Sequence, residues 1–305
     1  MDYLLTTNHL TKQYGRQKAV DQVNLHVRQG DIYGLIGRNG AGKTTILKMI
    51  SGLAAPTQGD FTLFGKTGKE IYPYMSRIGT LIEAPGVYAN MSAEQNLKMK
   101  CLAMGVRDPH AVSDLLEVVG LQNTGKKRVR SFSMGMKQRL GIALALVGNP
   151  DLVILDGEPI NGLDPQGIAE VRETLHRLNK EKHITFIISS HILEELSKIA
   201  TNYAIIHDGT LLQEMTREEL LAQCSERIEL KTDNPKLACT VLDRMGIAQY
   251  KVVDASTIHI FERLNDGGEI TMELAGNGVK IMGLSIKNEA LEDYYLNLTG
   301  GGKHV

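Results

Sequence analysis

The chain of 305 residues has no tryptophan, only three cysteines and almost no net charge. Cys101, Cys224 and Cys239 are scattered without a CxxC spacing or a Cys/His cluster, which argues against a zinc site and a disulfide framework. This use of cysteine is typical of a reducing, intracellular compartment. The 34 basic and 35 acidic residues leave a net charge of −1. The chain therefore lacks the excess of positive charge that binds a nucleic-acid phosphate backbone. We therefore expect no nucleic acid as a partner.

Long apolar runs are also missing. The first residues, MDYLLTTNHLTKQYG, lack the basic head and apolar run of a secretion signal. The longest apolar candidate, LGIALALVG (140–148), is far shorter than the span of about 20 residues that a membrane helix needs. We expect a chain that does not cross a membrane alone but can dock on a membrane protein. Its apolar content of 42% is ordinary for a globular protein.

The first clear fold signal is a strand, a glycine-rich loop and a helix in direct succession. Residues 31–36 (DIYGLI) predict a buried strand, GRNGAGKTT follows, and an apolar helical pattern continues to residue 50. This order begins a doubly wound α/β unit. Aliphatic runs predict further buried parallel strands at 152–155, 185–189 and 203–207, with helices at 175–182 and 192–200.

Two segments depart from this alternation. A helical insert is predicted at about 85–147, with helices at 93–104, 109–119 and 137–146. Beyond residue 225 the predicted order is βαββαβα, which indicates a compact α+β domain of about 80 residues. Its elements are expected at 228–231, 236–245, 250–253, 257–261, 269–275, 279–286 and 289–298. We expect two domains, 1–225 and 226–305.

The glycine-rich loop matches the pattern GxxxxGK[ST]. Its backbone N–H groups can surround a polyphosphate, and the helix that follows presents its positive N-terminus to the same phosphates. Lys43 supplies a charge for the β and γ phosphates, and the Thr44 hydroxyl can bind Mg²⁺. The alternative, a turn that binds nothing, is disfavoured by the flanking strand and helix. The candidate nucleotide-binding residues here are Gly37, Arg38, Asn39, Gly40, Ala41, Gly42, Lys43, Thr44 and Thr45.

A second acidic motif, LVILDGEPINGLDP, ends another buried strand. Asp156 closes the aliphatic run and Glu158 follows after a single glycine. Two carboxylates at this place favour metal or proton chemistry.

Together these motifs resemble the nucleotide-binding subunit of ATP-binding-cassette (ABC) transporters, over about residues 4–220. Tyr14 is placed like the aromatic residue that stacks on adenine. In SFSMGMKQRLGIA (131–143), Ser133 and Gly135 match the signature loop, which contacts the γ-phosphate held by another subunit. Phe132, Met134 and Met136 depart from its commonest form. A half-buried tyrosine and a simple helix cap at Ser133 are the plainer alternatives.

Three more positions extend the resemblance. The segment 161–164 (NGLD), ending in Asp164, resembles the D-loop at the dimer interface. His191 resembles the switch histidine that hydrogen-bonds the γ-phosphate, although a lone histidine is often structural. Glu83 stands where the family usually has glutamine, a feature that resembles bacitracin and lantibiotic self-protection exporters. Its carboxylate can reach Mg²⁺ or water; the alternative is a solvated loop glutamate.

The resemblance implies a P-loop NTPase fold with a helical insert, ATP and Mg²⁺ as cofactors, and ATP hydrolysis. Asp156 would hold Mg²⁺, Glu158 would orient or deprotonate the attacking water, and Lys43 would neutralise developing charge. One copy of each motif is half of two sites, which implies a second ATP-binding subunit, as in a homodimer. The chain would sit peripherally on the cytoplasmic face of the membrane, bound to an integral membrane permease, and would power export of peptide antibiotics or similar amphipathic compounds.

Two other functions remain open. One is a regulatory subunit that binds ATP but hydrolyses it weakly. The other is a soluble relative that acts on ribosomes or DNA, although the chain lacks tandem cassettes, long coiled coils and a basic stripe.

Gly157 is the irregular residue, because the family pattern places Asp and Glu side by side. In extended geometry one inserted residue would turn Glu158 to the other face and move it by about 3.3 Å. Glycine tolerates positive φ, so a bulge at Gly157 can absorb the insertion and return Glu158 to its usual place. We expect Mg²⁺–ATP binding to persist with slower turnover. The alternative is that Gly157 is an engineered change or an error in the sequence.

Overall fold

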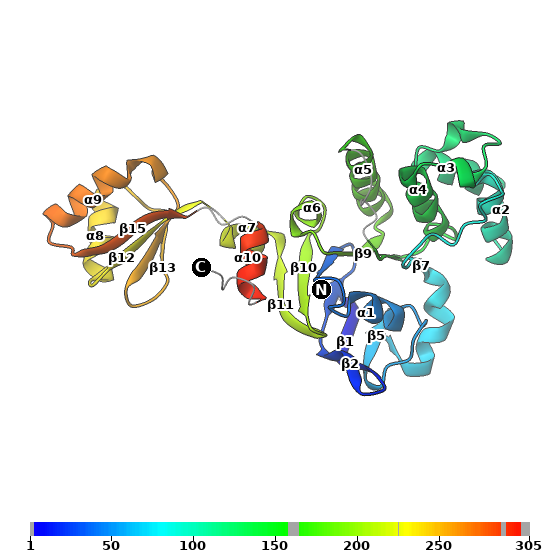
Figure 1. The fold of residues 1–305 in the computed structure, drawn as a ribbon, viewed down its shortest axis with the longest axis horizontal. Coiled ribbons are helices and arrows are strands. Elements are labelled where there is room, and N and C mark those ends of the chain that lie inside the picture. The colour runs from blue at the N-terminus through cyan, green and yellow to red at the C-terminus, as the bar shows by residue number, and fades with distance from the viewer. Residues whose placement is uncertain (1–2, 158–164, 225, 288–290, 300–305) are drawn as a thin grey trace. The chain divides into compact units, whose positions relative to one another are not determined.

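The computed structural model describes residues 3–157, 165–224, 226–287 and 291–299, and Figure 1 shows their elements. The chain divides into two compact units, Met1–Arg217 and Glu218–Val305. Each unit has its own hydrophobic core.

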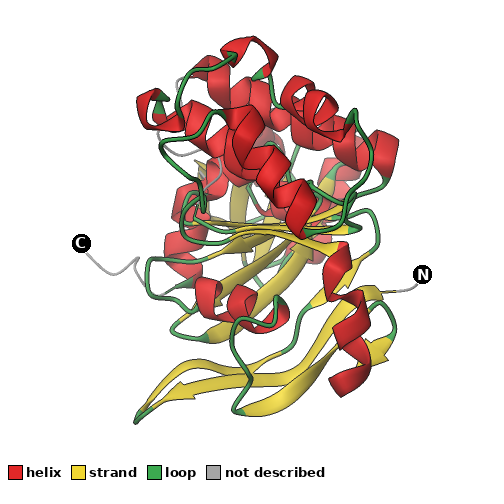
Figure 2. Ribbon diagram, turned by 90° about the vertical axis from the view of Figure 1, so that its right-hand side faces the viewer, coloured by secondary structure: helices red, strands yellow, loops and turns green. Residues whose placement is uncertain are grey.

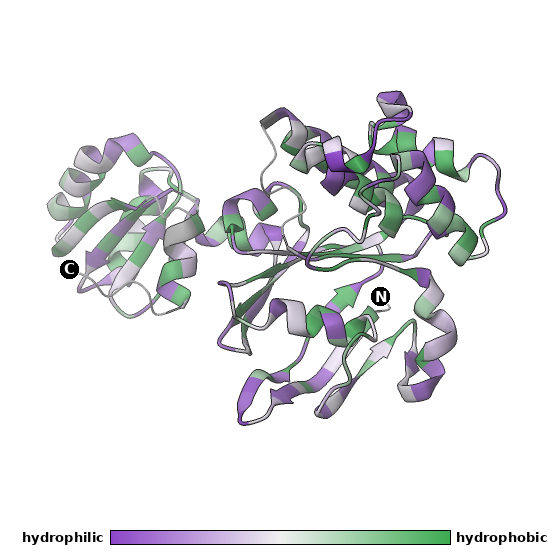
Figure 3. Ribbon diagram, turned by 45° about the vertical axis from the view of Figure 1, so that its right-hand side comes forward, coloured by the Kyte–Doolittle hydropathy of each residue, from purple (hydrophilic) through white to green (hydrophobic). Residues whose placement is uncertain are grey.

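The first unit is built on a six-stranded sheet of order β11-β10-β4-β9-β8-β7. Its strands are β4 (Ile32–Ile36), β7 (Ile78–Leu81), β8 (Leu152–Leu155), β9 (Thr185–Ser190), β10 (Asn202–His207) and β11 (Thr210–Thr216). All neighbours are parallel except β11, which runs antiparallel to β10. Every residue of β4, β8 and β9 is buried, as expected for central parallel strands covered on both faces. The predicted α/β fold is confirmed. Figure 3 shows these central strands largely in green, the colour of hydrophobic residues.

A second, antiparallel sheet is formed by strands that lie before and after β4 in the sequence, and it was not predicted. It contains β1 (Tyr3–Tyr14), β2 (Gln17–Val23), β3 (His26–Arg28), β5 (Gln58–Leu63) and β6 (Lys66–Thr67). The pairing of β1 with β2 shifts register between Leu10 and Lys12, and burial along β1 does not alternate regularly. This irregularity removes the period of two by which a half-buried strand is recognised.

Helix α1 (Lys43–Ile50) packs in the core that joins the two sheets. Its buried side chains Ile46, Leu47, Met49 and Ile50 share one cluster with residues of β1, β4 and β8. Figure 2 shows the two sheets lying one above the other. The start of α1, and with it the glycine-rich loop, is therefore held between both sheets.

The helical insert follows β7. Helices α2 (Ala93–Ala103), α3 (Ala111–Val118) and α4 (Met134–Ala145) occur where helices were predicted, and they lie together in Figure 1. Ser92 and Gln95 form a reciprocal capping box at the start of α2. Further α-helices are α5 (Pro165–Lys182), α6 (Leu193–Ser197) and α7 (Arg217–Gln223). The 3₁₀ segments are η1 (Gly68–Arg77), which has 10 residues, and the short turns η2 (Gln122–Thr124) and η3 (Val129–Ser131). Helix α5 is longer, and α6 shorter, than predicted.

The second unit contains the predicted βαββαβα order. Its four strands, β12 (Arg227–Thr232), β13 (Tyr250–Val252), β14 (Thr257–Ile260) and β15 (Ile281–Lys287), form an antiparallel sheet of order β13-β14-β12-β15. The helices are α8 (Pro235–Arg244), α9 (Gly267–Gly276) and α10 (Leu291–Leu298), with a short turn η4 (Leu264–Asp266). Strand order and helix placement are those of a split βαβ unit.

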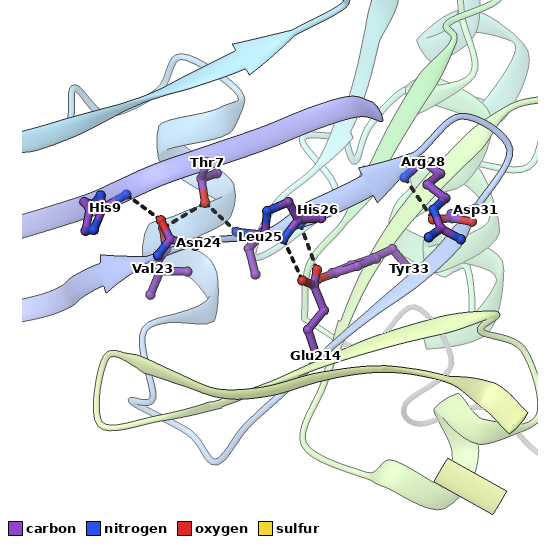
Figure 4. A network of polar contacts seen from close by, with 10 residues as sticks. All are labelled: Thr7, His9, Val23, Asn24, Leu25, His26, Arg28, Asp31, Tyr33 and Glu214. Atoms are coloured by element: carbon purple, nitrogen blue, oxygen red, sulfur yellow. Dashed lines mark hydrogen bonds and ion pairs between the residues drawn. The ribbon is translucent and has the colours of Figure 1, made fainter. Parts of the chain in front are cut away.

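A polar network links β3, β4 and β11 (Figure 4). The Tyr33 hydroxyl, on a fully buried side chain of β4, donates to Oε1 of Glu214. The backbone N–H of His26 donates to the same oxygen over 2.8 Å, and His26 Nδ1 lies 2.8 Å from Oε2. Burial and the Glu214 carboxylate raise the pKa of Tyr33 well above its usual value.

Glu214→Ala is expected to lower the free energy of unfolding of the first unit by about 2–3 kcal/mol, because it leaves the buried Tyr33 hydroxyl without its acceptor. Chemical denaturation followed by circular dichroism measures this change, because the chain has no tryptophan for fluorescence. The double variant Glu214→Ala/Tyr33→Phe is expected to regain part of the loss, because it also removes the orphaned donor. Glu181→Ala, at an exposed acid of α5 in the same unit, is the matched control. An equal loss in both Glu214 variants would contradict this account.

Candidate nucleotide-binding site

The glycine-rich loop joins the end of β4 to the start of α1 and is held by its neighbours. The Gly37 N–H donates to the Ser190 carbonyl of β9, and the Gly209 N–H donates to the Ala41 carbonyl. Gly42 has φ +103°, and a Cβ there would lie 2.5 Å from the Ala19 carbonyl oxygen. A Cβ at Gly37 would lie 2.6 Å from the Ile206 carbonyl oxygen. Close backbone approach therefore demands glycine at both positions.

Lys43 bends back over its own loop. Its Nζ lies 2.5 Å from the Gly37 carbonyl oxygen and 3.1 Å from that of Arg38. Burial lowers the pKa of Lys43, and the nearby Asp156 carboxylate opposes this shift. The loop thus holds a cation where backbone N–H groups and the N-terminus of α1 also favour an anion.

Asp156 is the buried carboxylate of this site, with 3% of its surface exposed. Its Oδ2 accepts a hydrogen bond from the Thr44 hydroxyl over 2.7 Å, and its Oδ1 accepts one from the Ser189 hydroxyl over 2.5 Å. Its own N–H donates to the Leu81 carbonyl over 2.7 Å. Ser189 was missed by the sequence analysis. The parallel pairing of Leu155 with Ile188 indicates this neighbour, because it places the residues that follow them, Asp156 and Ser189, side by side.

A cavity of about 430 Å³ opens beside the loop, and it brings most of the predicted nucleotide-binding residues together. It is lined by Tyr14, Ala19, Asn39, Gly40, Ala41, Gly42, Lys43, Thr44, Thr45, Lys48 and Glu83. Tyr14, at the end of β1, is half exposed, and Lys12 Nζ lies 5.1 Å from the centre of its ring.

Lys48 is the second residue that the sequence analysis missed. It lies on α1 four residues after Thr44, hence on the same face of the helix. Its Nζ lies 2.6 Å from Oε1 of Glu83, so the predicted Mg²⁺ candidate Glu83 is ion-paired.

Other predicted residues lie elsewhere. Ser133 caps α4 by accepting a hydrogen bond from the Met136 N–H over 3.2 Å, as the plainer alternative predicted, and Gly135 is in the first turn of the same helix. His191 is exposed directly after β9. Ser133, Gly135 and His191 are not among the described residues that line the cavity. Glu158 and Asp164 lie outside the described residues.

Gly157 adopts φ +80°, the left-handed conformation that the sequence analysis allowed for it. Its N–H donates to the Ser189 hydroxyl over 3.1 Å. A Cβ at this position would lie 3.3 Å from the Glu83 carbonyl oxygen. The glycine thus adopts a left-handed conformation immediately after Asp156, where a larger residue would crowd the backbone of Glu83.

Comparisons with known proteins agree with this geometry. The family profile described as ABC transporter matches residues 20–161. The bacitracin transport ATP-binding protein BcrA of Bacillus licheniformis is 43% identical over 307 residues, which cover 99% of each chain. This chain belongs to the family of ABC transporter ATP-binding proteins.

This ABC protein is also similar in sequence to a lantibiotic transport protein and in fold to solved ATP-binding cassettes. The lantibiotic transport ATP-binding protein SrtF of Streptococcus pyogenes is 42% identical over 211 residues, covering 69% of this chain and 90% of the relative. A dimeric ATP-binding cassette in a post-hydrolysis state with ADP and Pi has a TM-score of 0.63 at 22% identity. That match covers 70% of this chain and 98% of the cassette, and it shows the shared fold. Among the residues that the structure describes, no helix combines the length and apolarity needed to cross a membrane.

Proposed function

We propose that this chain is the ATP-binding and ATP-hydrolysing subunit that powers a membrane exporter of peptide antibiotics of the bacitracin or lantibiotic type, or of similar amphipathic compounds. The observation that carries the proposal is the convergence of Lys43, Thr44 and Asp156 beside a cavity edged by Tyr14. Similarity along 99% of a bacitracin transport ATP-binding protein supports this cargo class.

The loop residues 37–44 would hold the triphosphate of ATP through backbone N–H groups, and Tyr14 would stack on the adenine. Lys43 would exchange the carbonyls of Gly37 and Arg38 for phosphate oxygens, which would give the partly buried ammonium group a directly bonded anion. His191 would hydrogen-bond the γ-phosphate, and Glu158 would orient or deprotonate the attacking water.

The Thr44 hydroxyl and the Asp156 carboxylate suit Mg²⁺, because this ion prefers hard oxygen ligands. Their oxygens lie 2.7 Å apart at the end of β8, so both can face one ion. Glu83 is a further candidate ligand from the loop after β7. A bound Mg²⁺ would offset negative charge on the β and γ phosphates.

The site is completed by a second copy of the chain in our proposal. Ser133 and Gly135 start α4 and are not among the described residues that line the cavity, so a partner's signature loop would supply these groups. Asp164 would lie at the interface. The solved cassette of similar fold is itself dimeric. Closure of the dimer on ATP and its opening after hydrolysis would drive transport.

An integral membrane permease would be the second partner, and the chain would be peripheral on the cytoplasmic face of the membrane. The named relatives are ATP-binding proteins of transport systems, which supports this assignment.

Purification of the tagged chain from membranes tests the whole proposal. We expect a polytopic membrane protein to co-purify, and the complex to hydrolyse ATP faster when bacitracin or a lantibiotic is added. A chain recovered only with ribosomes or DNA would contradict the proposal. Stable ATP binding without steady-state hydrolysis would instead favour a regulatory subunit that binds ATP but hydrolyses it weakly. The inserted Gly157 is the reason for this alternative, because it separates Glu158 from Asp156 in the sequence.

A further inference from the structure

Lys48 forms an ion pair with Glu83, and Lys48 has no role in the proposed mechanism, in which Glu83 is a candidate Mg²⁺ ligand. Lys48 belongs to α1 and Glu83 to the loop after β7, and both line the nucleotide cavity. Their charged atoms are 2.6 Å apart, with side-chain exposures of 32% for Lys48 and 64% for Glu83.

The backbone of Glu83 is also constrained. Its φ is +64°, a conformation that residues with a side chain adopt infrequently. The neighbouring backbone segment is Asp156–Gly157: the Asp156 N–H donates to the Leu81 carbonyl, and a Cβ at Gly157 would lie 3.3 Å from the Glu83 carbonyl oxygen. The Glu83 carboxylate is therefore paired with Lys48, while its backbone lies close to the segment that follows β8.

Electrostatics gives this arrangement a consequence for nucleotide binding. ATP without Mg²⁺ brings several negative charges into the cavity, and a free Glu83 carboxylate would repel them. A glutamine at this position carries no such charge. Lys48 compensates the charge that glutamate adds, at the place where it is added.

We infer that Lys48 is a positioning residue, which holds the Glu83 carboxylate against α1 and neutralises it when the triphosphate enters. The inference rests on the proposed function, because it concerns the same nucleotide cavity. In this arrangement Lys48 acts through Glu83. The competing arrangement is a direct contact between Lys48 and a phosphate.

A double-mutant cycle separates the two arrangements. The dissociation constant of mant-ATP is measured in EDTA for the wild type, Lys48→Met, Glu83→Gln and the double variant. We expect Lys48→Met to weaken binding about fivefold, because Glu83 is then uncompensated. In the Glu83→Gln background the same substitution is expected to weaken binding less than about twofold. Equal weakening in both backgrounds overturns the inference in favour of a direct phosphate contact.

Two variants guard this test against structural artefacts. Lys98→Met removes a comparable ion pair, with Glu94 on α2 at 2.5 Å, outside the residues that line the cavity, and is expected to leave mant-ATP affinity unchanged. Lys48→Arg keeps the charge and is expected to bind within about twofold of the wild type. A fivefold loss in Lys48→Arg would overturn the charge argument. If the folded wild type does not bind mant-ATP at all, the proposed function falls and the inference with it.

Discussion

Asp156→Asn is expected to lower the rate of ATP hydrolysis at least about 100-fold while shifting the melting temperature by only a few degrees. The asparagine side chain has nearly the same shape and keeps one oxygen to accept a hydrogen bond from Thr44 or Ser189. It lacks the negative charge with which Asp156 would bind Mg²⁺. A hundredfold loss corresponds to about 2.7 kcal/mol of transition-state stabilisation, a usual value for an electrostatic group.

Steady-state hydrolysis and thermal unfolding of the same preparation provide the two measurements. Asp151→Asn is a matched control, because Asp151 directly precedes β8 at its opposite end and pairs with Arg77 over 2.6 Å. The Arg77 guanidinium lowers the pKa of Asp151, so this control is expected to lose about 0.5 kcal/mol of stability and no catalytic rate. Hydrolysis that survives Asp156→Asn would show that Asp156 does not hold the metal ion.

Deletion of Gly157 is expected to raise the rate of ATP hydrolysis about tenfold. The deletion places Glu158 directly after Asp156, as in the family pattern, and a catalytic group displaced by about 1 Å can cost a hundredfold in rate. The deletion also removes a residue at φ +80° that donates to Ser189. A faster enzyme would therefore show that the insertion displaces Glu158.

Gly157→Ala is the control for the deletion, because it keeps the insertion and adds only a methyl group. That group would lie 3.3 Å from the Glu83 carbonyl oxygen in a left-handed conformation, so the variant is expected to lose about 1 kcal/mol of stability. An unchanged rate after deletion would mean that the left-handed Gly157 already returns Glu158 to its place. Glu158→Gln in the deleted chain is expected to stop hydrolysis in either case.

The sequence by itself predicted the features that depend on local patterns. The spacing of glycines and Lys43 predicted a glycine-rich loop between a strand and a helix, with phosphate as its proposed ligand, and aliphatic runs identified the buried parallel strands. Helical periodicity located the insert, and the order of elements after residue 225 was also correct. The motifs together indicated the family, which the comparisons confirm. Regular periodicity carries such information because burial repeats with the geometry of each element.

The tertiary structure decided what depends on distant neighbours. The N-terminal sheet was missed because the irregular pairing of β1 hides its alternation. Ser189 meets Asp156, and Lys48 meets Glu83, only because β7, β8 and β9 lie side by side and α1 packs against them. Strand order follows from how all the elements share one core, and no short window of sequence contains it. For the same reason only the fold shows that Glu83 and Gly157, two of the departures from the family pattern, lie close together.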